Sequence, residues 1–328
     1  MRILFIDCAT YKPYSYETPK KEGLGGAEMI TIRIAYGLAQ RHHEVFIYNH
    51  TDLARAEIEY IYGIGHLGAQ TPCPKPDVVI HIRCHTNPSH WKQLFPKARH
   101  VIWYHDRAGA WMNKNDSDME GICVSHSHKI NIEQYIPTVE GFIKRPIHVI
   151  HNPVVTYPIR QKKIPGRLGF FSAPYKGLER CYELYAKAKR IRPHLTFACS
   201  NPGYFANGSL PEDAFNMGQL NHRETCDEIS KCEVLFMPVA IIPDSFGLVA
   251  PEANAMGTSV LACEFASVLE VASNCGNTLL PANATDNQII TALFELLDSK
   301  PLVKADKRFE LESILDQWEH FLSKPRAA

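Results

Sequence analysis

Two carboxylates, Asp244 and Glu252, lie eight positions apart on either side of the tripeptide Phe246-Gly247-Leu248. The residues that follow the tripeptide predict a short helix, so its backbone N–H groups are expected at a positive helix end, where a phosphate or an electron-rich sugar oxygen binds. Carboxylates beside such an anion suit sugar hydroxyls, which need hydrogen-bond acceptors. Local chemistry alone leaves an alternative, in which Asp244 is a helix cap and Glu252 a surface residue.

The ends of this helix are predicted from two residues. Pro251 suits a first helical turn, because the N–H that it lacks would have no partner there. Gly257 suits the left-handed conformation that commonly ends a helix. The tripeptide is therefore expected directly before the helix.

A second candidate group is the segment from Phe170 to Leu178, which is predicted as a strand, a turn and a helix start. It places Ser172 at the strand end and Lys176 in the turn. A cation at this point can neutralise a diphosphate leaving group, because charge builds on that group as its bond to the sugar breaks. A solvent-exposed turn lysine is the alternative.

A third candidate is the glycine-rich run Gly23-Leu24-Gly25-Gly26-Ala27-Glu28. It opens a helix whose apolar residues recur with a period near 3.6. A dinucleotide-binding loop would have Gly in place of Glu28, and its glycines would follow the first strand directly. Here they begin 15 residues after Cys8, which disfavours a nicotinamide site. A flexible loop with a helix cap remains open.

A strand-end histidine and a group of tyrosines complete the candidates. His105 ends the apolar run from Val101 to Tyr104, at the edge where a doubly wound sheet displays functional side chains. Without further information, a structural role for such a histidine is the more common one. Tyr11, Tyr14 and Tyr16 precede the glycine-rich run and are candidates for an apolar floor beneath a sugar.

The elements that must position these residues are short apolar strands that alternate with helical patterns. Continuous apolar strands of this kind indicate parallel sheets covered by helices on both faces. The first series of predicted strands is 3–8, 44–48, 77–82, 100–105, 121–125 and 147–151, and the second is 168–172, 195–199, 233–237, 259–263 and 277–280. The fold class is therefore α/β, with two Rossmann-like, doubly wound parallel sheets.

The domain boundaries follow from the segment 152–166, which is rich in proline and basic residues and is predicted as a linker. The predicted domains are 1–155 and 166–305, and two such halves facing one another would form a cleft. A last helix, about 306–322 within the C-terminal segment 306–328, has Trp318, Phe321 and Leu322 on one face.

Composition excludes several classes of protein. Lys plus Arg and Asp plus Glu both number 35 in the 328 residues, so no overall field recruits nucleic acid or an anionic membrane. No apolar run is long enough for a signal sequence or a membrane span. The ten cysteines lack metal-type spacing and are expected as reduced thiols of a cytoplasmic protein. His126 and His128 lack ligand partners at suitable spacing, so no metal site is predicted.

The segment around Phe246 resembles the signature of retaining glycosyltransferases of the GT-B fold, in particular glycosyltransferase family 4. The family pattern is Glu, any residue, Phe-Gly-Leu, three residues, then Glu-Ala. Asp244 stands in place of the first Glu, and Glu252 matches the second. The resemblance implies that Asp244 approaches the donor sugar, that Glu252 holds the ribose hydroxyls, and that the Phe246-Gly247-Leu248 backbone receives sugar and phosphate.

Other segments are similar to the same family. The resemblance implies that the loop with Gly25 and Gly26 reaches the diphosphate and the acceptor, that His105 contacts the donor sugar, and that the last helix returns to the first domain. It also implies that Lys176 contacts the diphosphate. The family has an Arg five residues before this Lys, where this chain has Phe171. Arg180 and Arg223 are the candidate substitutes.

The resemblance thus implies a retaining glycosyltransferase without a cofactor. No Asp-x-Asp motif stands in a metal-binding context, so the enzyme is expected to be metal-independent. Its donor is a UDP- or GDP-linked sugar, and its acceptor is a glycan, a lipid-linked molecule or a small molecule. The sequence leaves the base, the sugar, the oligomeric state and a peripheral membrane contact open. Two alternatives remain: a GT-B protein that binds nucleotide sugars without turnover, favoured by Asp244 and Phe171, and a GT-B epimerase or phosphorylase.

Overall fold

The computed structural model divides the chain into two compact units. The first unit comprises Met1–Thr18, Gly26–Pro153 and Arg308–Ala328, and the second comprises Pro19–Gly25 and Val154–Lys307. The described residues are 1–10, 12–51, 59–68, 71–83, 88–109, 112, 119–141, 146–155, 157–159, 161–201, 214–273 and 276–324.

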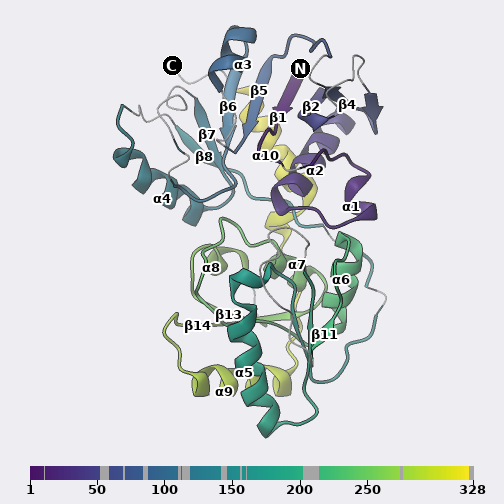
Figure 1. The fold of residues 1–328 in the computed structure, drawn as a ribbon, viewed down its shortest axis with the longest axis vertical. Helices are drawn as coiled ribbons and strands as arrows, with labels where there is room; N and C mark the ends of the chain where they lie inside the picture. Colours follow the sequence, from purple (N-terminus) through teal and green to yellow (C-terminus); the bar gives the residue numbers. More distant parts are fainter. Residues whose placement is uncertain are drawn as a thin grey trace. The chain divides into compact units, whose positions relative to one another are not determined.

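The first unit is built on a sheet whose described strands follow the order β3-β4-β2-β1-β5-β6-β7-β8 (Figure 1). All neighbouring strands pair in parallel except β3 and β4, which form an antiparallel hairpin at one edge. The strands are β1 (Arg2–Ile6), β2 (Glu44–Thr51), β3 (Glu59–Ile61), β4 (Ile64–Gly68), β5 (Val78–Ile82), β6 (Arg99–Trp103), β7 (Glu120–Cys123) and β8 (Ile147–Val149).

Helices cover both faces of this sheet. On one face, α2 (Gly26–Gln40) packs against α10 (Leu311–Ser323), whose Trp318 contacts Trp103 with ring centroids 4.7 Å apart. On the other face lie α3 (Pro88–Leu94) and α4 (His126–Tyr135), followed by the short helix η2 (Ile136–Thr138). The first unit is therefore a three-layered, doubly wound domain, into which the last helix of the chain is built.

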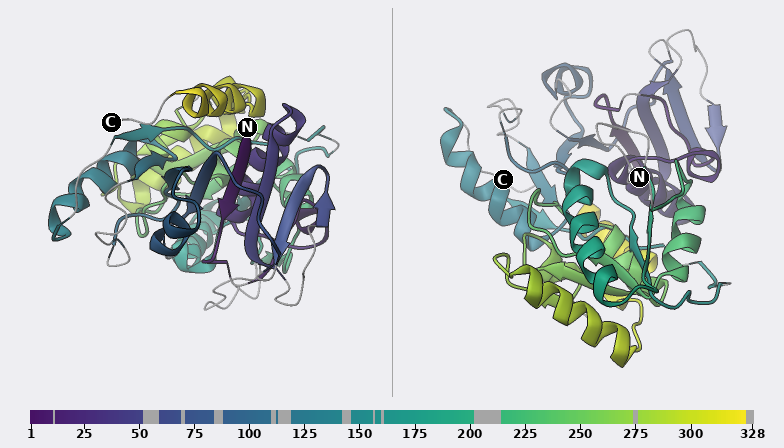
Figure 2. Two further views of the ribbon diagram at one scale, coloured as in Figure 1. Left: turned by 90° about the horizontal axis from the view of Figure 1, so that it is seen from above. Right: turned by 60° about the horizontal axis from the view of Figure 1, so that its bottom comes forward.

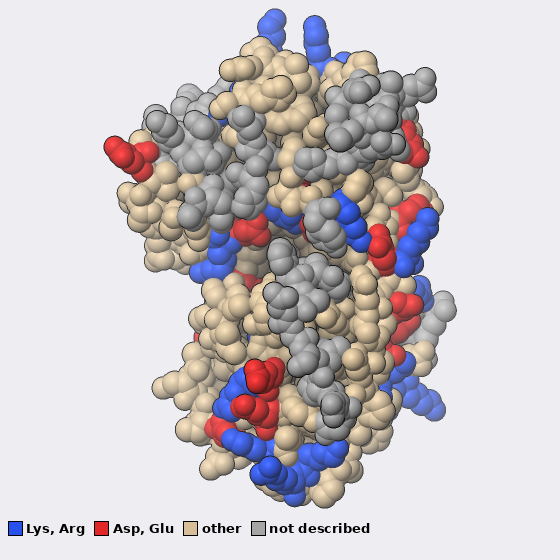
Figure 3. Space-filling view, viewed as in Figure 1, with Lys and Arg blue, Asp and Glu red and all other residues tan. Residues whose placement is uncertain are grey.

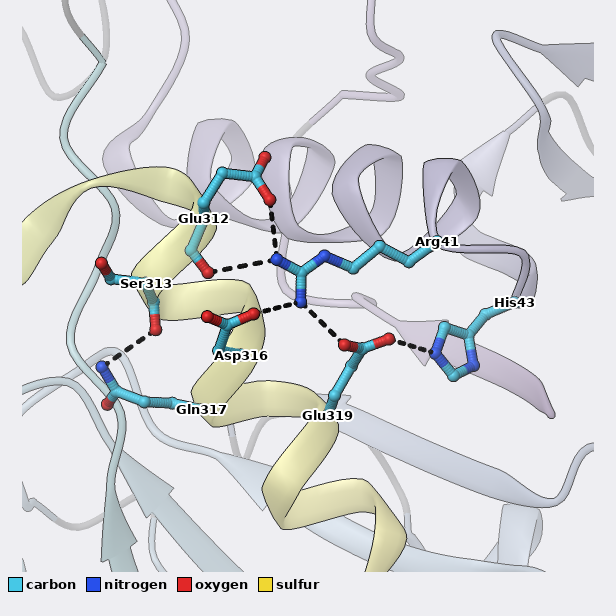
Figure 4. A network of polar contacts seen from close by, with 7 residues as sticks. All are labelled: Arg41, His43, Glu312, Ser313, Asp316, Gln317 and Glu319. Carbon is cyan, nitrogen blue, oxygen red and sulfur yellow. Dashed lines mark hydrogen bonds and ion pairs between the residues drawn. The ribbon is translucent and has the colours of Figure 1, made fainter.

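An ionic cluster joins α10 to the end of α2 (Figure 4). Arg41 is 2.7 Å from carboxylate oxygens of Glu312, Asp316 and Glu319, which lie on one side of α10. Glu319 also contacts His43 at 3.2 Å. The three carboxylates are more exposed than Arg41, so the apolar contacts beneath them contribute more to the attachment of α10 than the ion pairs do.

The second unit has a smaller, all-parallel sheet in the order β11-β10-β9-β12-β13-β14. On one face lie α5 (Leu178–Ile191) and α9 (Asp286–Ser299) (Figure 2). The two helices share an apolar core with the sheet. On the other face lie α6 (His222–Lys231), α7 (Val249–Ala255) and α8 (Val268–Val271). The strands are β9 (Arg167–Phe170), β10 (Thr196–Cys199), β11 (Phe215–Asn216), β12 (Val234–Met237), β13 (Ser259–Cys263) and β14 (Thr278–Leu280).

The remaining elements are short. The helix η3 (Pro174–Lys176) lies in the second unit, while α1 (Thr18–Lys21) and η4 (Lys307–Phe309) lie at two points where the chain passes from one unit to the other. Because η4 and the extended Glu310 occupy the start of the predicted last helix, α10 begins at Leu311 instead of near residue 306.

The predicted α/β class with two Rossmann-like sheets is confirmed, and every predicted strand is present with small shifts at its ends. Within the described ranges, three strands were not predicted: β3, β4 and β11. The β3–β4 hairpin also makes one edge antiparallel, so the larger sheet is not wholly parallel.

The charged side chains and the cysteines lie as the sequence led us to expect. On the face shown in Figure 3, basic and acidic side chains are interspersed. The eight described cysteines are all free. Within the described residues, no helix combines the length and the apolar character needed to cross a membrane.

Candidate active site

The second sheet reverses its winding direction between β9 and β12. From the central β9 the chain first crosses to β10 on one side and later enters β12 on the other. Loops that leave the carboxyl ends of two such strands diverge and leave room for a ligand. The loop after β9 carries Lys176, and the loop after β12 carries Asp244.

A glycine leaves room for these two loops to lie close together. Gly177 follows Lys176 with a φ of +114°, and a Cβ added there would lie 2.7 Å from Cγ2 of Val239 in the loop after β12. This close approach and the left-handed backbone both require glycine. As a result, Lys176 Nζ lies 2.5 Å from Asp244 Oδ1, and each side chain is 22% exposed. The structure therefore joins two predicted site residues that are 68 positions apart.

The turn from Asp244 to Gly247 is held by a buried serine. Ser267 Oγ donates to the carbonyl oxygens of Asp244 at 3.1 Å and Phe246 at 2.9 Å. Gly247 has a φ of +77°, and its missing Cβ would lie 3.4 Å from the Cβ of Asp244. Phe246 is buried in the core.

The helix α7 begins at Val249 with Leu248 as its N-cap residue, so Pro251 lies in the first turn and the tripeptide directly precedes the helix, as predicted. Its end agrees with the prediction, because Gly257 has a φ of +67°. Since Glu252 lies in the first turns of α7, its carboxylate is carried on the same short segment as Gly247.

Glu252 is buried and has a hydrogen-bond partner that the sequence did not reveal. Its Oε1 lies 2.8 Å from Nε2 of His222, the first residue of α6. The other ring nitrogen of His222, Nδ1, lies 2.9 Å from the hydroxyl of Tyr157. The alternative of a surface Glu252 is thereby excluded, since only 8% of the residue is exposed.

The residues around Lys176 include Phe171, which stands where the resemblance implies an Arg. Ser172 is half-buried beyond the end of β9. Phe171 is buried and packs against Gly169, where a Cβ would come within 2.5 Å of its ring. Arg180 is ion-paired with Asp286 of α9.

The second candidate substitute, Arg223, lies with its guanidinium carbon 5.2 Å from the centre of the Tyr157 ring. A ring face and a guanidinium at this separation attract each other. Thus Arg180 contacts a carboxylate on α9 and Arg223 contacts Tyr157, while Lys176 is the cation paired with Asp244.

The first unit also has a charged cluster where its sheet reverses direction, between β1 and β5. Asp7 follows β1, and its Oδ2 accepts a hydrogen bond from the hydroxyl of Tyr14 at 2.8 Å. Arg83 follows β5 with a φ of +60°, which is uncommon for a residue other than glycine. It contacts Glu28 at 2.5 Å and Asp7 at 3.9 Å. Burial raises the pKa of Asp7, although Arg83 opposes this shift.

His105 follows β6, the neighbour of β5, and is also buried. Burial, together with the charge of Arg83 and with His128, lowers its pKa well below the ordinary value, so the imidazole is neutral at pH 7. Among the described residues, its Nε2 has no hydrogen-bond partner. Its ring lies 4.4 Å from that of Trp103.

The glycine-rich loop passes from one unit to the other, and the tyrosines before it have different partners. Gly25 is buried and belongs to the second unit, while Gly26 is the first residue of α2 in the first unit. Tyr14 is bonded to Asp7, and Tyr16 packs on Tyr36 with centroids 4.3 Å apart. The predicted tyrosine floor is therefore divided, and Tyr11 lies outside the described residues.

Comparison with solved structures identifies the fold. Sucrose-phosphate synthase from Thermosynechococcus elongatus matches with a TM-score of 0.70 at 16% identity, over 98% of each chain. The chain has the GT-B fold. Two other matches that share this GT-B likeness are HepE from Anabaena, in complex with UDP and glucose, and WaaG, a glycosyltransferase involved in lipopolysaccharide biosynthesis.

HepE matches with a TM-score of 0.66 at 16% identity, over 98% of this chain and 99% of HepE. WaaG matches with a TM-score of 0.59 at 14% identity, over 99% of this chain and 96% of WaaG. No protein-family model and no curated protein sequence matches the chain. The likeness at these identities establishes the GT-B fold alone, and the activity must be argued from the site.

Proposed function

We propose that the chain is a retaining, metal-independent glycosyltransferase that moves a hexosyl group from a nucleotide-diphospho-sugar to an acceptor. The observation that carries the proposal is the Lys176–Asp244 pair beside Gly247, where the second sheet reverses direction. A cation, a carboxylate and a turn backbone at one point match the three needs of this substrate: phosphate charge, sugar hydroxyls and close approach.

In the proposed mechanism Lys176 acts on the leaving group. As the glycosidic bond breaks, negative charge grows on the diphosphate, and a cation already held in place stabilises that charge without reorganisation. Asp244 is assigned to the sugar, where its carboxylate accepts hydrogen bonds from hydroxyls. Since Asp244 pairs with Lys176 in the free protein, donor binding must loosen or share this contact.

Glu252 is assigned to the ribose of the nucleotide. A buried carboxylate with one oxygen engaged by His222 retains acceptor capacity on its other oxygen for a hydroxyl. The solved complexes of HepE with UDP and with UDP-glucose make UDP the first nucleotide to test, with GDP beside it.

The acceptor is assigned to the first unit. There a neutral His105 and the Asp7–Arg83–Glu28 cluster provide hydrogen-bonding groups at the carboxyl end of the sheet. The acceptor is proposed to be a glycan, a lipid-linked molecule or a small molecule bearing hydroxyls. Retention of the anomeric configuration is proposed from the resemblance of the Asp244–Glu252 segment to retaining enzymes.

A second candidate function, binding of nucleotide sugars without turnover, is favoured by one observation. Phe171 is packed in the core where the family has a cation, so the diphosphate would meet one basic side chain instead of two. A nucleotide-sugar-binding protein without turnover would fit that arrangement.

Donor turnover separates the two candidates. Release of UDP or GDP from a panel of nucleotide sugars, with and without acceptors, is expected for the wild type and reduced for Lys176→Ala. Binding without any release would support the second candidate and contradict the first. A new glycoside among the products would also exclude an epimerase, and its formation from a nucleotide sugar would exclude a phosphorylase.

A further inference from the structure

We propose that His222 is a positioning residue that orients Glu252 toward the ribose hydroxyls, and that Tyr157 selects the tautomer of His222 needed for this. The inference rests on the proposed function, because it concerns the ribose part of the same donor site. His222 acts only through Glu252 and is not expected to touch the reacting atoms.

The contacts form a chain of three side chains from separate segments of the second unit. Tyr157 lies in the segment before β9, His222 begins α6, and Glu252 lies on α7. The hydroxyl of Tyr157 is 2.9 Å from Nδ1, and Nε2 is 2.8 Å from Oε1 of Glu252. Both distances are those of well-formed hydrogen bonds.

The direction of each hydrogen bond follows from the chemistry of the groups. An ionised carboxylate can only accept, so Nε2 of His222 must carry the proton that is donated to Glu252. In a neutral imidazole the other nitrogen is then an acceptor, and the hydroxyl of Tyr157 donates to it. Tyr157 thereby favours the tautomer that Glu252 requires. Outer groups orient metal-ligating histidines and carboxylates by the same principle.

Local structure keeps this histidine in place. Asn221 caps α6: its side chain accepts a hydrogen bond from the backbone N–H of Glu224, and the carboxylate of Glu224 accepts one from the backbone N–H of Asn221. This capping box fixes the first turn of α6. His222 and Glu252 are 7% and 8% exposed, so neither side chain has room to adopt many orientations. Glu252 therefore offers its second oxygen in a defined direction before a ligand arrives.

The ligand that would use this arrangement is a ribonucleoside diphosphate. Its neighbouring 2′ and 3′ hydroxyls can both donate to one carboxylate, whereas a dideoxy nucleotide offers no donor there. A buried carboxylate that accepts from a ribose hydroxyl discriminates strongly against an analogue that lacks it. Orientation of Glu252 should therefore matter for the ribonucleotide and not for the dideoxy nucleotide.

The experiment measures binding of UDP and of 2′,3′-dideoxy-UDP by calorimetry, with the corresponding guanosine pair in parallel. The wild type is expected to bind the ribonucleotide more tightly than its dideoxy analogue. In His222→Ala the affinity for the ribonucleotide should fall by about tenfold, which corresponds to ~1.4 kcal/mol. The affinity for the dideoxy analogue should stay within about twofold, which also shows that the variant is folded.

Two further variants sharpen the test. His222→Gln can still donate an amide N–H toward Glu252 and should recover part of the lost affinity, while Tyr157→Phe should give a smaller loss with the same dependence on ribose hydroxyls. The matched control is His194→Ala, at an exposed histidine of the same unit, which should change neither affinity.

Three outcomes would overturn the inference. Equal losses for both nucleotides in His222→Ala would show a general structural role. Unchanged affinity for the ribonucleotide would remove His222 from the site. A wild type that binds no nucleotide would overturn the proposed function itself, which is a different result from a wild type that binds nucleotide but is insensitive to His222.

Discussion

If Lys176 binds the diphosphate as proposed, its contact with Asp244 restrains that cation in the free protein. Nζ and Oδ1 are 2.5 Å apart, so a diphosphate must compete with Asp244 for the charge of Lys176. Replacing the carboxylate in Asp244→Asn preserves the size of the side chain and removes its charge. The variant should bind the nucleoside diphosphate more tightly and turn over the sugar donor more slowly.

The magnitude follows from the geometry and the exposure of the pair. Coulomb's law gives ~7 kcal/mol of direct attraction at this distance for an effective dielectric constant of ~20. Most of it is offset by removing two charges from water and by ordering two side chains. For side chains that are 22% exposed we expect a net contribution of about 1 kcal/mol. The affinity for UDP should therefore rise about fivefold in Asp244→Asn.

Calorimetry with UDP on the wild type and Asp244→Asn measures this effect, and release of UDP from the sugar donor measures the loss of turnover. Asp286→Asn is the matched control, because Asp286 is ion-paired with Arg180 and Lys187 in the same unit and is 30% exposed. The control should leave the affinity for UDP unchanged. If Asp244→Asn bound UDP equally or more weakly, Asp244 would not compete with the diphosphate and the reasoning would be refuted.

Three other predictions concern metal, packing and pH. Transfer activity should survive EDTA, because Lys176 is assigned the charge of the diphosphate; loss on chelation and rescue by Mg²⁺ or Mn²⁺ would contradict this. Gly37→Ala should lower the free energy of unfolding by up to about 2 kcal/mol in urea titrations, since its Cβ would lie 2.4 Å from Cδ1 of buried Leu315 and overpacking outweighs the gain in helix propensity; an unchanged or higher stability would show that Leu315 moves freely. Burial lowers the pKa of His128 to about 4, whereas a histidine in the unfolded chain titrates near 6.5. Between these pH values the unfolded state binds a proton that the folded state does not, so the free energy of unfolding should decrease as the pH drops from about 6.5 to about 4. In urea titrations at pH 7 and 5, His128→Gln should show a smaller decrease than the wild type.

The parts of the fold that could be predicted from sequence are those whose signal is local. The strands β1, β5, β9 and β12 are short apolar runs between turn signals, and all were found. The missed β4 is Ile64-Gly65-His66-Leu67-Gly68, whose glycines and histidine break the apolar run, although the folded strand is buried. The missed β11 has only two residues, both exposed, so burial left no pattern in it.

In the candidate site, too, only the residues with a local sequence signal could be predicted. Asp244, Gly247 and Glu252 lie within nine residues and carry a spacing that sequence can display. The contact between Glu252 and His222 spans 30 positions and depends on how α6 packs against α7. No periodicity or motif encodes that packing. Arg83 was missed for the same reason, since its partner Glu28 is 55 positions away and only the strand order brings the two together.

The two points at which the sheets reverse direction differ in what they offer an anion. In the first unit, Arg83 contacts Glu28 at 2.5 Å and lies 3.9 Å from both Asp7 and Asp106. Among the described residues, Glu28 and Asp106 outnumber Arg83 in this cluster even with Asp7 protonated, which disfavours a diphosphate there. In the second unit, Lys176 forms an ion pair with Asp244, and its side chain is more exposed than that of Arg83. We therefore infer that the diphosphate is bound in the second unit. The carboxylates of the first unit would repel a phosphate but can accept hydrogen bonds from hydroxyl groups, so this cluster suits a neutral, hydroxyl-bearing acceptor substrate.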